Sequence, residues 1–87
     1  MENKLIKYIQ NAKRAETHKS EMKRFQKYLD LLETQTEAAE QEGNTTLVNA
    51  LAGIWDYYNE KKLIAELNYT EVKREMILFE LDSYLPF

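Results

Sequence analysis

The residues most suited to chemistry are His18, Ser20 and Glu21, which lie close together near the N-terminus. His18 is the only histidine of the 87 residues, and the chain has no cysteine. Carboxylate metal sites in helical bundles combine Glu-x-x-His pairs with further inward-facing glutamates. The order here is the reverse, with His18 followed three residues later by Glu21. We therefore predict no metal site and no cofactor.

A nucleophilic centre is not indicated either. Ser20 and Ser83 are the only serines, and His18 lies two residues from Ser20, a spacing that puts their side chains on different faces of a helix. Phosphate-binding loops need several glycines ahead of a helix, whereas this chain has only Gly43 and Gly53. We predict no catalytic residues and a protein that is not an enzyme.

The elements that position these residues are predicted to be helices. Glycine and proline are rare, with two and one respectively, and the abundant Leu, Lys, Glu, Ala and Gln favour helix. Apolar residues recur at three- and four-residue spacing. The pattern predicts one helical domain over residues 1–87, with helices at about 3–42, 46–67 and 69–84.

The boundaries between these helices rest on few residues. Gly43 favours a helix end because glycine adopts the left-handed conformation freely, and Asn44, Thr45 or Thr46 can cap the next helix. Asn68 followed by Glu71 resembles a capping box and predicts a break there, although one long helix over both segments is the alternative. Pro86 predicts that the last residues leave the helix.

The predicted fold is all-α: a long N-terminal helix turned at Gly43 into an antiparallel hairpin or three-helix bundle, which we expect to form a homodimer. Two segments, 55–58 and 76–81, are apolar almost all round and must be covered on every side. They either meet each other in a compact core or bind another chain. Gly53 lies inside the second helix, and we expect a close helix–helix approach there. The hydrophobic contact residues predicted from this pattern are Leu51, Trp55, Tyr57, Tyr58 and Phe79.

Charge is unevenly distributed along the chain. Residues 1–27 hold eight basic and three acidic residues, a net charge of +5, and residues 28–87 hold four basic and twelve acidic residues, a net charge of −8. No Lys or Arg lies between Lys27 and Lys61. If Gly43 reverses the chain, an acidic tip forms that suits a basic partner, such as a nucleic-acid-binding protein. Its predicted residues are Glu33, Glu37, Glu40, Glu42 and Asp56.

The basic N-terminal stretch supports two interpretations. In an antiparallel hairpin it lies beside the acidic C-terminal half, so ion pairing within the chain is the interpretation we favour. The alternative is contact with the phosphates of a nucleic acid. The residues that would make these contacts are Lys13, Arg14, Lys19, Lys23, Arg24 and Lys27.

The class of protein follows from these observations. The sequence has no apolar run long enough to span a membrane and no cysteine, so we expect a cytoplasmic protein. We predict a non-enzymatic protein-binding module, such as an inhibitor, regulator or adaptor encoded by a phage or a bacterium. The size and midpoint turn also resemble the helical-hairpin proteins of type VII secretion, which implies a secreted partner protein as another alternative. Their Trp-x-Gly turn motif and C-terminal Tyr-x-x-x-Asp/Glu signal are absent from this chain.

Overall fold

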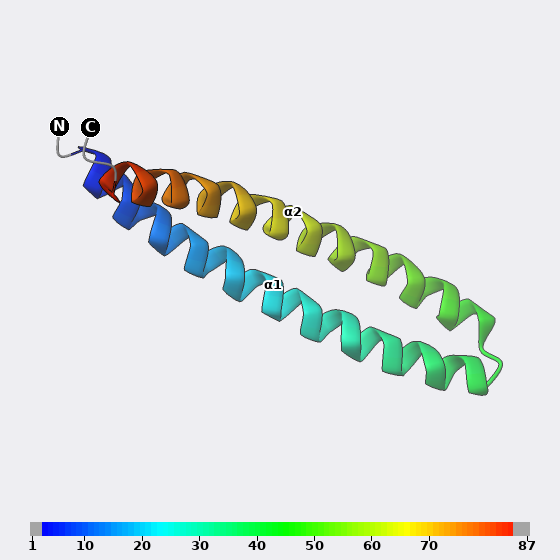
Figure 1. Cartoon of the computed structure of the whole chain (residues 1–87). Coiled ribbons are helices and arrows are strands. Elements are labelled where there is room, and N and C mark those ends of the chain that lie inside the picture. The colour runs from blue at the N-terminus through cyan, green and yellow to red at the C-terminus, as the bar shows by residue number, and fades with distance from the viewer. Residues whose placement is uncertain (1–2, 85–87) are drawn as a thin grey trace.

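Two long helices make up the described part of the chain, which is residues 3–84 of a computed structural model. Helix α1 spans Asn3–Gln41 and helix α2 spans Thr45–Tyr84. They run antiparallel, so both termini lie at the end of the rod opposite the turn (Figure 1). The predicted all-α hairpin is confirmed. The predictions for Leu85, Pro86 and Phe87 lie outside the described residues.

The predicted third helix is not a separate element within residues 3–84. Helix α2 continues through Asn68, so the predicted break was wrong, and the alternative of one long helix describes the structure. The physical reason is packing: Ala65 and Val72 are buried on either side of Asn68, and Tyr69 packs against the core. The seam therefore stabilises the helix where the local capping pattern favours an end. Helix α1 likewise runs unbroken through the polar stretch at residues 17–20.

The turn is built by Gly43 and Asn44. Gly43 has a φ of 70°, and its N–H donates to the carbonyl of Glu40 at 3.0 Å, while the Asn44 N–H donates to Ala39 at 3.0 Å. These two bonds form a Schellman motif, which satisfies the last carbonyls of α1. The Asn44 side chain then accepts a hydrogen bond from the Leu47 N–H at 3.1 Å and caps α2.

The two helices pack along a seam with the three-four spacing of a coiled coil. One core cluster, near the termini, contains Ala15, Val72 and Met76. A second, near the turn, contains Leu32, Ala39 and Leu51, with Val48, Trp55 and Tyr58 packed against it. Residues 55–58 and 76–81 thus lie in different halves of the rod and do not form one compact core.

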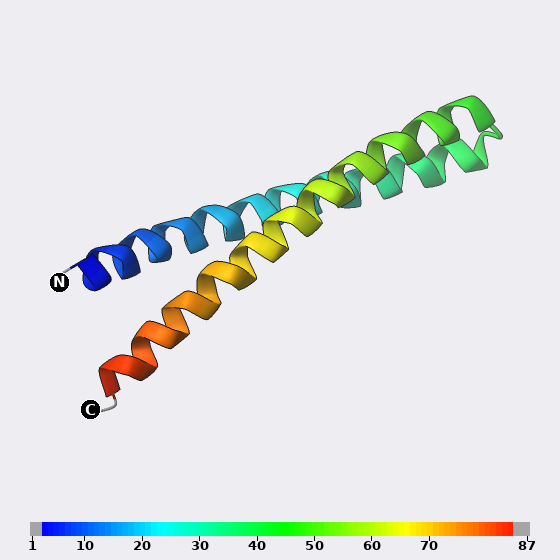
Figure 2. The ribbon, with the colours of Figure 1, turned by 90° about the horizontal axis from the view of Figure 1, so that it is seen from above.

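The molecule is a thin rod. It measures 66 × 18 × 14 Å and has a radius of gyration of 19.4 Å, whereas a compact domain of this length has about 12 Å. The ribbons separate near the turn in Figure 1 and near the termini in Figure 2, because the helices wind about each other. Neither α1 nor α2 has the length and apolar character needed to cross a membrane.

Gly53 does not serve a close approach of the helices. It is exposed, and a Cβ added there would meet nothing within 4 Å. The prediction was wrong because Gly53 lies on the side of α2 that faces away from α1.

Candidate functional site

Four of the five predicted acidic-tip residues meet in one hollow near the turn. Its volume is about 360 Å³. Glu33, Glu37 and Glu40 come from α1, and Asp56 comes from α2. Glu42 lies outside it. The residues that line this acidic hollow are Glu33, Thr36, Glu37, Glu40, Ala52, Trp55 and Asp56.

Helical spacing explains how the hollow forms. Glu33 and Glu40 each follow a buried seam residue of α1, Leu32 and Ala39. On α2, Ala52 likewise follows the buried Leu51. Successive residues of a helix turn by about 100°, so positions that follow the seam lie together on one side of the hairpin. We call this side the acidic face.

The indole of Trp55 forms part of the hollow wall. Trp55 is partly buried and packs against the core cluster of Leu32, Ala39 and Leu51, which fixes its position between the helices. Ala52, three residues before Trp55, also lines the hollow with a small side chain. An apolar ring and four carboxylates are therefore presented together, an arrangement suited to the stem and charged head of a Lys or Arg side chain.

The carboxylates of the hollow have no cationic partner in the described chain. Within residues 3–84 the ion pairs are His18 with Glu21 and Arg74 with Glu71, and none involves the hollow. The sequence places no Lys or Arg between Lys27 and Lys61. The negative charge of this end is thus left for solvent ions or a partner.

The predicted hydrophobic contact residues have different environments. Leu51 is buried in the core, while Trp55, Tyr58 and Phe79 are partly buried along the seam. Phe79 stacks on Tyr8 with a centroid distance of 4.7 Å. Only Tyr57 is largely exposed, at 55%. Leu51 is therefore a core residue with little surface to offer a partner.

Tyr57 belongs to an aromatic cluster in the middle of the rod. Its ring lies edge-on to Tyr58 at 5.2 Å, and Tyr28 meets the same Tyr58 ring at 5.1 Å. Phe25 lies 6.1 Å from Tyr58. Sequence reasoning missed Tyr28 as a surface residue; the signal was its place directly before the seam residue Leu29, just as Tyr57 directly precedes Tyr58.

The six basic residues are exposed on α1. The favoured ion pairing with α2 was wrong for the described residues, because no Lys or Arg of α1 forms an ion pair with a carboxylate of α2. The buried seam residues are mostly small or apolar, as Ala15, Leu29 and Leu32 are, and the long cationic side chains point outward. Arg24 lies over the Phe25 ring at 5.0 Å. The residues concerned are Lys13, Arg14, Lys19, Lys23, Arg24 and Lys27.

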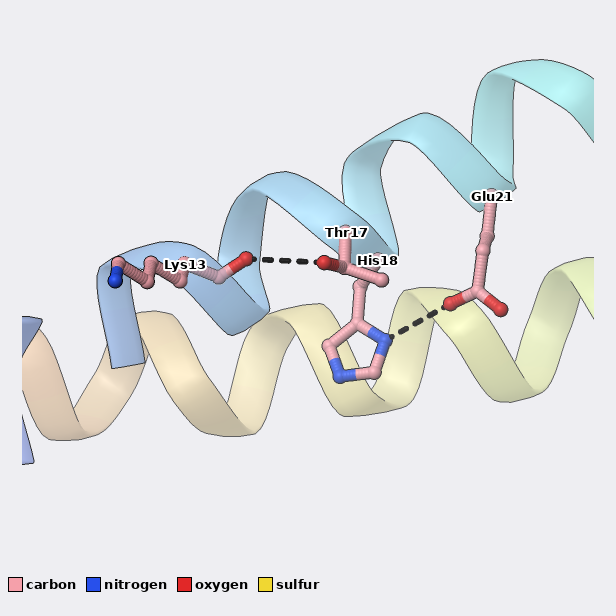
Figure 3. Close-up of polar contacts among 4 residues, drawn as sticks. All are labelled: Lys13, Thr17, His18 and Glu21. Carbon is pink, nitrogen blue, oxygen red and sulfur yellow. Dashed lines mark hydrogen bonds and ion pairs between the residues drawn. The ribbon is translucent and has the colours of Figure 1, made fainter. Parts of the chain in front are cut away.

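His18 and Glu21 form a local pair on α1. His18 Nδ1 lies 3.1 Å from Glu21 Oε1, and Figure 3 shows both side chains on the side of α1 that faces α2. Thr17, in the same figure, donates its hydroxyl to the Lys13 carbonyl at 3.1 Å. Among residues 3–84 no group of three or more His, Cys, Asp or Glu side chains is placed to hold a metal ion.

A second hollow, of about 260 Å³, lies near the termini. Asn11 is buried there, with 3% of its surface exposed, and its Nδ2 donates to Glu75 at 3.2 Å. Tyr8 donates to Glu80 at 2.5 Å. This hydrogen bond, with smaller contributions from desolvation and the negative charge of Glu80, raises the pKa of Tyr8. The hollow holds both Lys4 and Lys7 and the acidic Glu75 and Asp82, so it lacks the single charge sign of the acidic hollow.

Comparison with known proteins adds no relative: no family model, no curated protein and no solved structure matches this chain.

Proposed function

We propose that this chain is a non-enzymatic protein-binding module whose acidic hollow receives a basic segment of a larger protein. The observation that carries the proposal is the meeting of Glu33, Glu37, Glu40 and Asp56 around Trp55. These carboxylates form no ion pair within residues 3–84. A hollow of one charge sign attracts an oppositely charged partner and orients its approach.

The partner chemistry follows from the residues of the hollow. An extended segment rich in Lys or Arg would place a cationic head among the carboxylates and its aliphatic stem against Trp55. Such segments are common in proteins that bind nucleic acids. A small inhibitor, regulator or adaptor that occupies such a segment would compete with its nucleic acid.

Binding at the hollow can be followed by tryptophan fluorescence, because Trp55 is the only tryptophan of the chain. We expect a short oligoarginine peptide to change the Trp55 fluorescence saturably, and an oligoglutamate peptide to leave it unchanged. Added salt should weaken the binding, since exposed charges are screened. The absence of a fluorescence change at low salt would contradict the proposal.

A matched pair of double variants tests the location. Glu37→Gln with Asp56→Asn removes two charges from the hollow, and Glu16→Gln with Asp82→Asn removes two charges elsewhere. We expect the first pair to weaken peptide binding by about three- to thirtyfold, from exposed charges worth up to about 1 kcal/mol each. We expect the second pair to have little effect. Equal effects would show that only net charge matters and would reject the hollow as the site.

The second candidate is nucleic-acid binding through the basic residues of α1. It is favoured by one observation: these side chains are exposed and form no ion pair with α2 within residues 3–84. Titration of generic duplex DNA at several salt concentrations tests it, because phosphate contacts give a steep dependence of affinity on salt. No binding at low salt would remove this candidate.

A further inference from the structure

The side of the hairpin opposite the acidic face is apolar from the middle of the rod to the turn. Its members each directly precede a seam residue, as Ile54 precedes Trp55 and Ile64 precedes Ala65. All are between 40% and 57% exposed. We define this apolar face by six residues: Tyr28, Leu31, Leu47, Ile54, Tyr57 and Ile64.

We propose that the apolar face binds a second copy of this chain in an isologous, antiparallel dimer, which is a four-helix bundle. Helices of such bundles carry a wide apolar stripe that includes one position beside the seam. Helix α2 has this stripe on one side only. The other side holds the acidic hollow, which stays open to solvent in this dimer.

The chain exposes enough surface to bury a standard interface with a second copy. A folded monomer of 10.4 kDa exposes about 5,400 Å², whereas this chain exposes 6865 Å². The surplus of about 1,500 Å² exceeds the roughly 800 Å² that each partner buries in a standard interface. One dimer contact through the apolar face therefore fits within the surplus.

The outer side of α2 is a weaker candidate for the same contact. It carries Leu63, Leu67 and Leu81, which are more than half exposed. Thr70 and Arg74 interrupt this row and are themselves exposed. The apolar face also holds Lys61, whose ammonium lies over the Tyr57 ring at 5.4 Å, but it is continuous with the aromatic cluster around Tyr58 and with the core beneath it.

Charge decides the direction of the second copy. In a parallel dimer the two acidic tips would lie side by side, and no Lys or Arg lies between Lys27 and Lys61 to separate them. Like charges placed together are unfavourable. In an antiparallel dimer each acidic tip instead approaches the basic half of the other α1.

The register of the hairpin makes the apolar face self-complementary. Residues that face each other across the seam have numbers that add up to about 87, as Tyr8 with Phe79 and Gln26 with Lys62 show. Leu47 is thus level with residue 40 of α1, and Ile64 with residue 23. The point midway between these two levels lies at Leu31. A two-fold axis at that point would place Leu47 of one copy against Ile64 of the other.

The oligomeric state gives the first test, by sedimentation equilibrium of the full chain. We expect a mass of twice 10.4 kDa. Ile54→Glu should raise the dissociation constant at least about tenfold, because an unpaired charge would be buried in the interface. The matched control Leu67→Glu places the same charge on the outer side of α2 and should leave the dimer intact.

Helical circular dichroism must be unchanged in both variants, because both positions are exposed in the single chain. A monomer at high micromolar concentration would overturn the proposal. Dissociation by Leu67→Glu but not by Ile54→Glu would overturn the choice of face.

Cysteine cross-linking tests the direction, and the absence of native cysteine makes it specific. We expect Leu47→Cys and Ile64→Cys each to remain uncrosslinked alone, and an equimolar mixture to form a disulfide-linked dimer on mild oxidation. A parallel dimer would leave the mixture uncrosslinked, because Leu47 of one copy and Ile64 of the other would then lie 17 residues, or about 26 Å, apart along the rod. Failure of the peptide titration at the acidic hollow would leave this result unaffected, because the two faces lie on opposite sides of the hairpin.

Discussion

At the scale of single residues, Asn11 is buried in the seam although its amide is only half satisfied. Nδ2 donates to Glu75, but Oδ1 has no hydrogen-bond partner in the described chain. A buried polar group without a partner costs stability. A polar residue at a seam position can nevertheless fix the register of a coiled coil, and Asn11 occupies such a position.

We expect Asn11→Leu to raise the free energy of unfolding by about 1 kcal/mol, because it removes a buried, unsatisfied oxygen. The adjacent hollow of about 260 Å³ gives room for the larger side chain. Urea denaturation measures the change, with the exposed Asn49→Leu as a control expected within about 0.5 kcal/mol of the parent. A less stable Asn11→Leu protein would contradict this account of the site.

Tyr8 makes the free energy of unfolding depend on pH in alkaline solution. Its hydrogen bond to Glu80 raises its pKa above the usual value of 10.0, so the folded state favours the protonated phenol. The stabilisation is complete below pH 10 and is lost as the pH rises through the raised pKa. Tyr8→Phe keeps the ring that stacks on Phe79 and removes the proton.

The measurement is the difference in unfolding free energy between the parent and Tyr8→Phe. We expect it to be constant below pH 10 and to shrink above it. A difference that does not depend on pH between neutral and strongly alkaline solution would show that the bond to Glu80 does not contribute.

At the scale of the elements, the two glycines have opposite roles. Gly43 has a φ of 70°, a conformation that costs an L-residue with a side chain about 1–2 kcal/mol. Gly53 lies in regular helix with open space around it. The same chemical change at the two positions therefore separates a required turn from a replaceable residue.

We expect Gly43→Ala to lower the free energy of unfolding by about 1 kcal/mol and Gly53→Ala to raise it by about 0.5–1 kcal/mol. Urea denaturation at one protein concentration compares them directly. Equal effects of the two substitutions would contradict the turn described here.

Helix α2 shows where prediction from local sequence succeeds and where it fails. The Gly43 turn was predicted because its left-handed conformation is a property of one residue. The break near Asn68 was predicted by the same kind of signal and was wrong. The reason is that Ala65, Tyr69 and Val72 continue the seam across it, and packing against α1 outweighs a capping preference.

At the scale of the whole molecule, the length of the rod tests the proposed dimer in solution. The proposed two-fold axis lies about nine residues from the middle of α1, so each hairpin extends past the other by about 27 Å at 1.5 Å per residue. Added to the 66 Å hairpin, this gives a rod of roughly 90–95 Å. Small-angle X-ray scattering of the dimer should report this maximum dimension, whereas a maximum dimension of about 66 Å would contradict the proposed position of the two-fold axis.

The sequence by itself determined the all-helical class and the turn at Gly43, because propensity, periodicity and glycine conformation act within a few residues, but it predicted a break at Asn68 that the structure lacks. It also placed Glu33, Glu37 and Glu40 in an acid-only stretch. Only the tertiary structure decided that Trp55 joins the acidic residues and that Glu42 does not, that the cations of α1 stay unpaired with α2 in the described residues, and that toward the turn one side of the rod is acidic and the other apolar. Those features depend on the rotation and register of one helix against the other, which the packing of the whole seam sets and no local pattern encodes.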